Sequence, residues 1–151
     1  MLKLYINDVG ILTNLLYDRN INAVLRDENS VNLGAVYESV VAQELHTHGF
    51  PLYYYDNKQK GEVDFLIDNF SNLKVLPIVV KSGKDYSIHS ALNNFINNPD
   101  YNISEAVVFS NSREVKQRNG ITYMPIYYCM FFERHPNDDC IIPEIPLPQD
   151  F

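Results

Sequence analysis

Two short stretches of this 151-residue chain carry residues that could do chemistry together. "GEVDFLID" holds Asp64, and "LPIVVKSGKD" holds Lys81. A carboxylate can hold Mg²⁺ or Mn²⁺ against a phosphate, so that the metal lowers the pKa of an attacking water, while a lysine orients that water or stabilises developing charge. The pair therefore fits metal-dependent cleavage of a phosphate ester. The alternative is an ordinary ion pair at a sheet edge, since acids and lysines on neighbouring strands are common.

Strand geometry must bring these two side chains together. Alternation along the expected strand places Glu62 and Asp64 on one face. Val63 and Phe65 should then point to the other face. If the two strands pair as a hairpin across "NFSN", Asp64 and Lys81 lie close together at one end of a sheet.

A helix can add a third polar group to this site. "NLGAVYESVVAQELHTHGF" places apolar residues at three- and four-residue steps and ends at Gly49, which predicts an amphipathic helix with a glycine cap. Glu38 lies at the edge of its apolar stripe and can face the sheet. Glu44 is the rival, and a salt bridge at the helix boundary is the alternative role for either residue. His46 and His48 are two positions apart and do not share a helix face, so a zinc site is not expected there.

The remaining patterns predict an α/β fold. A short apolar strand and a helix are expected in "KLYINDVGILTNLLYD", and the polar stretch that follows predicts a loop or weak helix. After the central helix we expect a three-strand meander, an amphipathic helix closed by Pro99 and a further strand. The predicted segments of that part are "LYYYD", "EVDFLID", "KVLPIVVK", "DYSIHSALNNFINNP" and "ISEAVVFS". "ITYMPIYYCMFF" predicts a strand followed by an aromatic helix or a second strand.

These elements divide the chain into three parts. Residues 1–32 form an N-terminal strand and helix appendage, residues 33–132 the core domain, and residues 133–151 a proline-rich acidic tail. The chain is long enough for one hydrophobic core.

Composition and charge narrow the function classes. The net charge of -7 argues against a protein that coats nucleic acid by neutralising phosphates. No apolar run approaches the roughly 20 residues of a membrane-spanning helix, and the first residues lack the features of a secretory signal. The two cysteines, Cys129 and Cys140, are expected to be free thiols in a reducing compartment. A cytoplasmic protein without a membrane partner is the expectation.

The order of these motifs resembles a known family. "GAVYESVVAQELHTHG", "GEVDFLI" and "PIVVKSG" are similar to the PD-(D/E)xK nuclease-like superfamily, and within it to domain of unknown function 4143, which is attached C-terminally to bacterial AAA-type ATPases. The resemblance implies a restriction-endonuclease-like core. It also implies that Glu38, Asp64 and Lys81 occupy the catalytic positions, and that an AAA-type ATPase module is a partner, in the same longer protein or in trans.

The chain departs from the family pattern at one position. The glutamate of the family's "IEVK" aligns with Val79, which cannot bind a metal. Asp64, the carbonyl of Val80 and an outer-shell Glu38 could still hold a weak Mg²⁺ or Mn²⁺ ion, with Glu62 as a substitute ligand. Losing one carboxylate ligand should nevertheless impair catalysis severely, because catalysis depends on closely held ligand geometry.

These residues lead to three hypotheses about function. The first is a nuclease-like module with a degenerate active site, which acts in recognition or assembly and requires no cofactor; the aromatic segment "YMPIYYCMFF" could then supply an interface. The second is an active Mg²⁺- or Mn²⁺-dependent DNA endonuclease. The third is a pure protein-interaction domain. DNA binding without cleavage fits the acidic composition less well.

Overall fold

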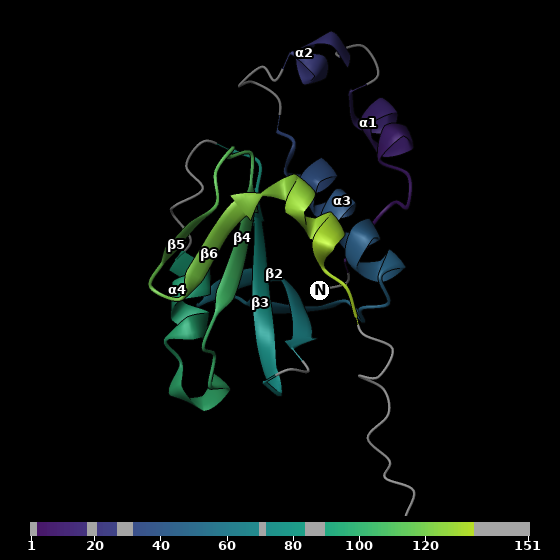
Figure 1. Cartoon of the computed structure of the whole chain (residues 1–151). Coiled ribbons are helices and arrows are strands. Elements are labelled where there is room, and N and C mark those ends of the chain that lie inside the picture. The colour runs from purple at the N-terminus through teal and green to yellow at the C-terminus, as the bar shows by residue number, and fades with distance from the viewer. Residues whose placement is uncertain (1–2, 18–20, 27–31, 70–71, 84–89, 135–151) are drawn as a thin grey trace, which may run out of the picture.

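The strands of the chain form one mixed sheet. The computed structural model describes residues 3–17, 21–26, 32–69, 72–83 and 90–134 (Figure 1). In this part of the chain the sheet has the strand order β1-β2-β3-β4-β6-β5. The strands are β1 (Tyr53–Asn57), β2 (Gly61–Asn69), β3 (Lys74–Lys81), β4 (Ala106–Ser110), β5 (Lys116–Arg118) and β6 (Ile121–Pro125). The predicted α/β class is confirmed.

The sheet combines an antiparallel half and a parallel half. β1, β2 and β3 pair antiparallel in sequence order, as the meander prediction requires. β3 pairs parallel with β4, and β4 pairs parallel with β6, because α4 and its connections carry the chain back across the sheet. The short edge strand β5, which the sequence pattern did not predict, pairs antiparallel with β6.

Helices cover the two faces of the sheet separately. α3 (Gly34–Thr47) and the 3₁₀ helix η2 (Ile126–Phe131) lie side by side on one face, and α4 (Ser90–Ile96) lies on the other, followed by the short 3₁₀ helix η1 (Pro99–Tyr101). α1 (Val9–Tyr17) and α2 (Ile21–Leu25) precede α3, and α1 packs against it. No helix in the described residues is long and apolar enough to cross a membrane.

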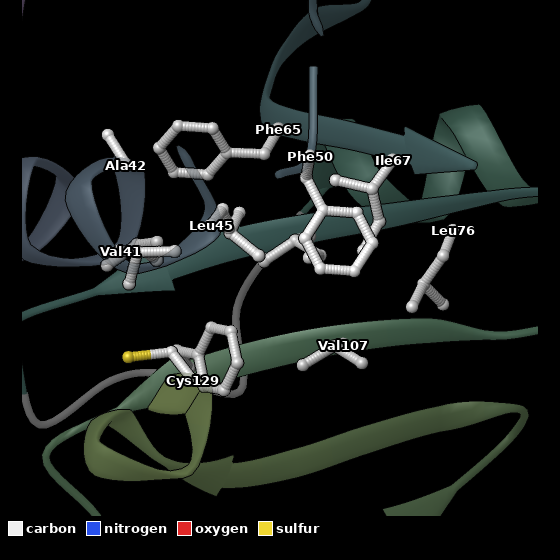
Figure 2. Packing of buried hydrophobic residues seen from close by; sticks show 12 residues of the cluster. Val41, Ala42, Leu45, Phe50, Phe65, Ile67, Leu76, Val107 and Cys129 are labelled. Atoms are coloured by element: carbon white, nitrogen blue, oxygen red, sulfur yellow. The ribbon is translucent and has the colours of Figure 1, made fainter. Parts of the chain in front are cut away.

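The larger half of the core lies beneath α3. Val41 and Leu45 of α3 form one cluster there with Phe65 and Val107 (Figure 2), and Phe109 and further residues of β2, β3 and β4 belong to the same cluster. Leu45 and Phe109 are fully buried, and Phe65 is almost so. Burying such side chains contributes about 1.5–3 kcal/mol each relative to their exposed state, so this packing fixes α3 on the sheet.

The smaller half of the core lies beneath α4. Leu92 and Phe95 of α4 pack against Val63, Val79 and Val108 of the sheet. A close approach joins the start of β2 to the same helix: Gly61 has a positive φ of 91°, and a Cβ atom there would lie 2.6 Å from the Cβ of Ala91. Only glycine fits this position.

The structure differs from the prediction at the N-terminal end of the chain and agrees with it in the aromatic segment. The strand expected within residues 3–8 does not form, because this segment packs over the α3 side of the sheet instead of pairing at its edge. The aromatic segment divides into β6 and the 3₁₀ helix η2, which agrees with the prediction of a strand followed by a helix. Residues 85–89 of the predicted second helix, Cys140 and all of the predicted tail except Glu133 and Arg134 lie outside the described residues.

One irregularity in β2 changes which way its side chains point. Tyr53 of β1 pairs with Leu66, but Tyr55 pairs with Val63, so two residues of β2 stand opposite one residue of β1. This is a β-bulge at Asp64 and Phe65, and such bulges re-aim side chains. The expectation that Val63 and Phe65 share a face is therefore wrong: Val63 packs beneath α4 and Phe65 beneath α3.

Candidate functional site

Three carboxylates converge on one ammonium group beside α3. Lys3 Nζ lies 3.6 Å from Glu38 Oε2 and 3.6 Å from Asp64 Oδ1, and it forms a closer ion pair with Glu62 Oε1. We call Glu38, Glu62 and Asp64 the carboxylate cluster. Its members come from α3 and β2, and the lysine comes from residues 3–7, which we call the N-terminal segment.

Local structure explains why the carboxylates meet. The bulge in β2 lets Asp64 reach the α3 side together with the following residue, Phe65. The first turn of α3 lies beside the end of β3, since a Cβ atom on Gly34 would lie 3.9 Å from Ser82 Oγ. Glu38, about one turn further along α3, therefore faces the sheet.

The N-terminal segment is held over this site by its own packing. The ring of Tyr5 contacts Phe65 with 5.6 Å between ring centroids. The Lys3 ammonium also lies 5.6 Å from the centroid of Tyr54, a cation–π distance. Burial raises the pKa of Tyr5 to about 12, so its ring remains neutral at physiological pH.

Burial shapes the protonation of the cluster. It raises the pKa of Asp64 above the usual value, although the Val80 N–H and the Lys3 charge oppose this effect. Burial and the negative charge of Asp64 likewise raise the pKa of Glu38. Burial alone would lower the pKa of Lys3, but the hydrogen bond to Glu62 and the charge of Asp64 outweigh it and raise that pKa. The ammonium is therefore firmly charged.

Asp64 is also fixed by a backbone hydrogen bond. The Val80 N–H donates to Asp64 Oδ2 over 2.7 Å. The sequence pattern predicts that the Val80 carbonyl contributes to a metal site, whereas the contact that the structure shows between Val80 and Asp64 is made by the Val80 N–H group. Asp64 Oδ2 therefore accepts from Val80, while Oδ1 faces the Lys3 ammonium. Only 13% of the Asp64 side chain is exposed, which leaves little room for another partner.

Lys81 lies near the cluster without joining it. It ends β3 and is half-buried, and its charge lowers the pKa of Asp64. Within the described residues it forms no ion pair within 4.0 Å of a carboxylate. The predicted pairing of Asp64 with a lysine is thus realised by Lys3, which the sequence pattern did not single out.

Val79 is a core residue. It is 3% exposed and packs in the cluster beneath α4 with Leu92 and Phe95. The carboxylate cluster lies on the α3 side of the same sheet. In this chain, the position to which the resemblance would assign a metal-binding glutamate therefore belongs to the apolar interior.

The other polar candidates lie apart from the cluster. Glu44 contacts His48 at 3.9 Å along α3, and its charge contributes to raising the pKa of Cys129 in η2. His48 Nδ1 lies 2.6 Å from the Phe132 carbonyl oxygen, whereas His46 lines a pocket of about 250 Å³ together with Lys3 and the rest of the N-terminal segment. Glu38, and not Glu44, therefore belongs to the cluster. Across the described ranges no group of three or more histidine, cysteine or acidic residues is arranged to hold a metal ion.

The residue types of the carboxylate cluster suit a metal ion, but their arrangement around Lys3 does not. Three carboxylates are the oxygen ligands that Mg²⁺ or Mn²⁺ prefers. Their oxygens surround the Lys3 ammonium, however, which carries one of the positive charges that a metal would bring. With Lys3 in this position, the residues do not fit a metal ion. The only signal for Lys3 in the sequence is a single basic residue in an apolar stretch, which does not indicate its distant partners.

Comparisons with known proteins identify a family but no characterised relative. Searches of curated proteins and of solved structures found no match. The family model described as "Domain of unknown function (DUF4143)" matches residues 33–129, which include Glu38, Glu62, Asp64 and Lys81 but not Lys3. Because that match covers more than half of the chain, the chain belongs to the DUF4143 family.

Proposed function

We propose that this domain is a PD-(D/E)xK nuclease-like module that has lost its catalytic metal site and acts in recognition or assembly for a bacterial AAA-type ATPase. The ATPase module would belong to the same longer protein or bind in trans. A restriction-endonuclease-like core is part of this proposal. The observation that carries it is the Lys3 ammonium among Glu38, Glu62 and Asp64.

Two features support the loss of catalysis. The ammonium neutralises part of the charge that would attract Mg²⁺ or Mn²⁺, and it stands among the oxygens that would bind the ion. Val79 supplies methyl groups at the motif position and is packed into the core. Without a bound metal, a water at this site keeps its high pKa and is a poor nucleophile.

Exposed apolar side chains on η2 support a role in recognition or assembly. Tyr127, Met130 and Phe131 are 55%, 51% and 66% exposed. Aromatic residues and methionine are enriched in protein interfaces. These side chains could anchor the ATPase module, and Asp64 would then have no part in the binding.

DNA cleavage tests the loss of catalysis. With Mn²⁺, wild type and Asp64→Ala should both cleave plasmid DNA no faster than the background rate without protein. Asp68→Ala, which removes an exposed carboxylate of the same strand, is the matched control. Cleavage by wild type and Asp68→Ala that disappears in Asp64→Ala would overturn the proposal.

Binding to the ATPase module tests the positive part. Phe131→Asp should weaken association at least about tenfold, because it places a charge within an apolar contact. Asp64→Ala should leave the affinity unchanged. Equal binding by wild type and Phe131→Asp would argue against the η2 surface.

An active Mg²⁺- or Mn²⁺-dependent DNA endonuclease is the second candidate. The convergence of Glu38, Glu62 and Asp64 favours it, since three carboxylates could hold a cation if Lys3 moved away. The cleavage assay separates this candidate from the first. The third candidate is a pure protein-interaction domain. It also predicts that Phe131→Asp weakens partner binding, but it requires no relation to nucleases.

A further inference from the structure

β1 is the unprotected edge of the sheet. Within the described residues it stands at one end of the strand order and pairs only with β2, so its outer N–H and C=O groups can bind another strand. Proteins usually protect such edges by a short strand, by lysine or by proline. β5, at the other end, has three exposed residues, two of them basic. β1 has five residues without lysine or proline, and Asp56 is its only charged residue.

Tyrosine side chains lie beside this edge on the α4 face of the sheet. The centroid of the Tyr55 ring lies 4.9 Å from that of Phe95 and 6.1 Å from that of Tyr101. Tyr53 pairs with Leu66, which packs in the core beneath α4, so Tyr53 points to the same face. Tyr53 is 57% exposed and Tyr101 is 38% exposed. We call Tyr53, Tyr55 and Tyr101 the tyrosine surface; tyrosine is enriched in protein interfaces.

The opposite face of β1 is partly covered by the N-terminal segment. Lys3 lies over the ring of Tyr54 there, and Asp56, two positions further along the strand, is exposed. The N-terminal segment forms no strand beside β1. The described chain therefore covers a face of β1 and adds no strand to its outer edge.

β1 is complementary to itself in one antiparallel register. Directly opposite residues of an antiparallel pair share a face, so two copies related by a two-fold axis must pair around one central residue. A pair centred on Tyr55 includes all five residues of the strand. Asp56 then lies opposite Tyr54. Tyr53 lies opposite Asn57. A pair centred on Asp56 would instead place two carboxylates opposite each other, which is destabilising.

We propose that the outer edge of β1 binds a second copy of this chain, in an antiparallel β1–β1 pair centred on Tyr55 that joins the two sheets into one. The tyrosine surfaces of the two copies then meet on the α4 side of the joint. This contact involves neither η2 nor the carboxylate cluster, so it goes beyond the proposed function and does not depend on it. One short strand and its flanking side chains bury a small area, and we expect a Kd of about 1–100 μM.

Sedimentation velocity over a concentration series tests the proposal. The wild type should convert from monomer to dimer as its concentration rises to about 500 μM. Two double variants test the register, because they differ only in the charge at position 53. Tyr53→Asp with Asn57→Asp places like charges opposite each other at both ends of the β1 pair. Tyr53→Lys with Asn57→Asp places opposite charges there, and this variant should dimerise at least about tenfold more tightly than the first.

The substitutions are chosen to leave the monomer intact. Tyr53 is exposed, and aspartate at position 57 keeps an acceptor oxygen where Asn57 Oδ1 accepts from the N–H groups of Gln59 and Lys60. Gln117→Asp adds a negative charge to β5, the other edge strand, and is the control. It should leave the Kd of the wild type unchanged.

Hydrogen exchange of the wild type locates the contact without any substitution. The β1 amides that point to the outer edge should exchange several-fold more slowly at the highest concentration than at the lowest, whereas the β5 amides should not change. A wild type that stays monomeric overturns the proposal and leaves β1 as an edge for a strand of another protein. A dimer that forms equally well in the two double variants, or that protects no β1 amide, places the contact elsewhere and also overturns it.

Discussion

Lys3 Nζ lies 3.6 Å from Asp64 Oδ1, although α1, α2 and α3 all separate the two residues along the chain. The contact joins the N-terminal segment to β2, the strand that carries Asp64. It replaces the pairing with Lys81 that the strand pattern predicts. The charge balance of the carboxylate cluster therefore depends on Lys3, which lies outside residues 33–129 that the family model matches.

The first prediction concerns Val79. Val79→Glu should destabilise the fold by about 3–5 kcal/mol, because it buries a carboxylate among Leu92 and Phe95 without a partner. Urea unfolding measures the change. Val115→Glu, at a side chain that is 49% exposed, should have little effect. A stable Val79→Glu protein that binds Mn²⁺ would instead mean that this position faces the carboxylate cluster.

The second prediction concerns Gly61. Gly61→Ala should lower stability by about 1–3 kcal/mol from backbone strain at its positive φ, and the clash with Ala91 should add to this loss. Gly83→Ala is the matched control, since a Cβ atom there meets nothing within 4 Å. Similar melting temperatures for the two variants would contradict the close approach of β2 and α4.

The third prediction concerns pH. Burial and the charge of Asp64 raise the pKa of Glu38, so the folded state binds this proton more tightly than the unfolded state. The resulting stabilisation is present below the unfolded pKa and is lost as pH rises through the folded pKa. Relative to Glu38→Gln, wild type should gain stability as the pH falls from 7 to 4.

Urea unfolding at both pH values checks this pH dependence. Glu114→Gln, at a side chain that is 73% exposed, serves as the comparison. Its stability should change with pH in nearly the same way as that of wild type. A wild type that loses stability relative to Glu38→Gln on acidification would show that ion pairing with Lys3 outweighs burial.

The fourth prediction concerns Cys129. Burial first, and then the negative charge of Glu44, raise the pKa of this thiol to about 11. Alkylation of Cys129 at pH 8 should therefore be at least about a hundredfold slower in the folded protein than in urea, since the thiolate is the reactive form. Mass spectrometry of the Cys129 peptide measures both rates. Rapid labelling of the folded protein would contradict the burial of η2 against the sheet.

The helices and strands whose apolar residues follow a regular local pattern could be predicted from the sequence. The apolar spacing in α3, the alternating strand around Glu62 and the continuous apolar run that follows Lys74 are local sequence patterns. These patterns put Asp64 on the strand and a glutamate of α3 on the side facing the sheet, but the choice between Glu38 and Glu44 required the structure. β5 escaped prediction because its three residues, Lys116–Arg118, are all exposed and have no apolar pattern.

The bulge and the Lys3 contact were not predictable, because both depend on the tertiary structure. A strict two-residue period puts Val63 and Phe65 on one face, and only the pairing with β1 reveals the extra residue. The role of Lys3 requires the path of the N-terminal segment over α3 and β2. Ring packing between Tyr5 and Phe65 sets that path, and no local pattern encodes it.

Paramagnetic broadening by Mn²⁺ tests the central claim most directly, namely that Lys3 keeps divalent ions out of the wild-type cluster. The Val80 N–H donates to Asp64 Oδ2, so its NMR signal reports any ion bound by that carboxylate. We predict that sub-stoichiometric Mn²⁺ leaves the Val80 signal of the wild-type protein as intense as the signals of β4. Selective loss of the Val80 signal in the wild type would contradict the account.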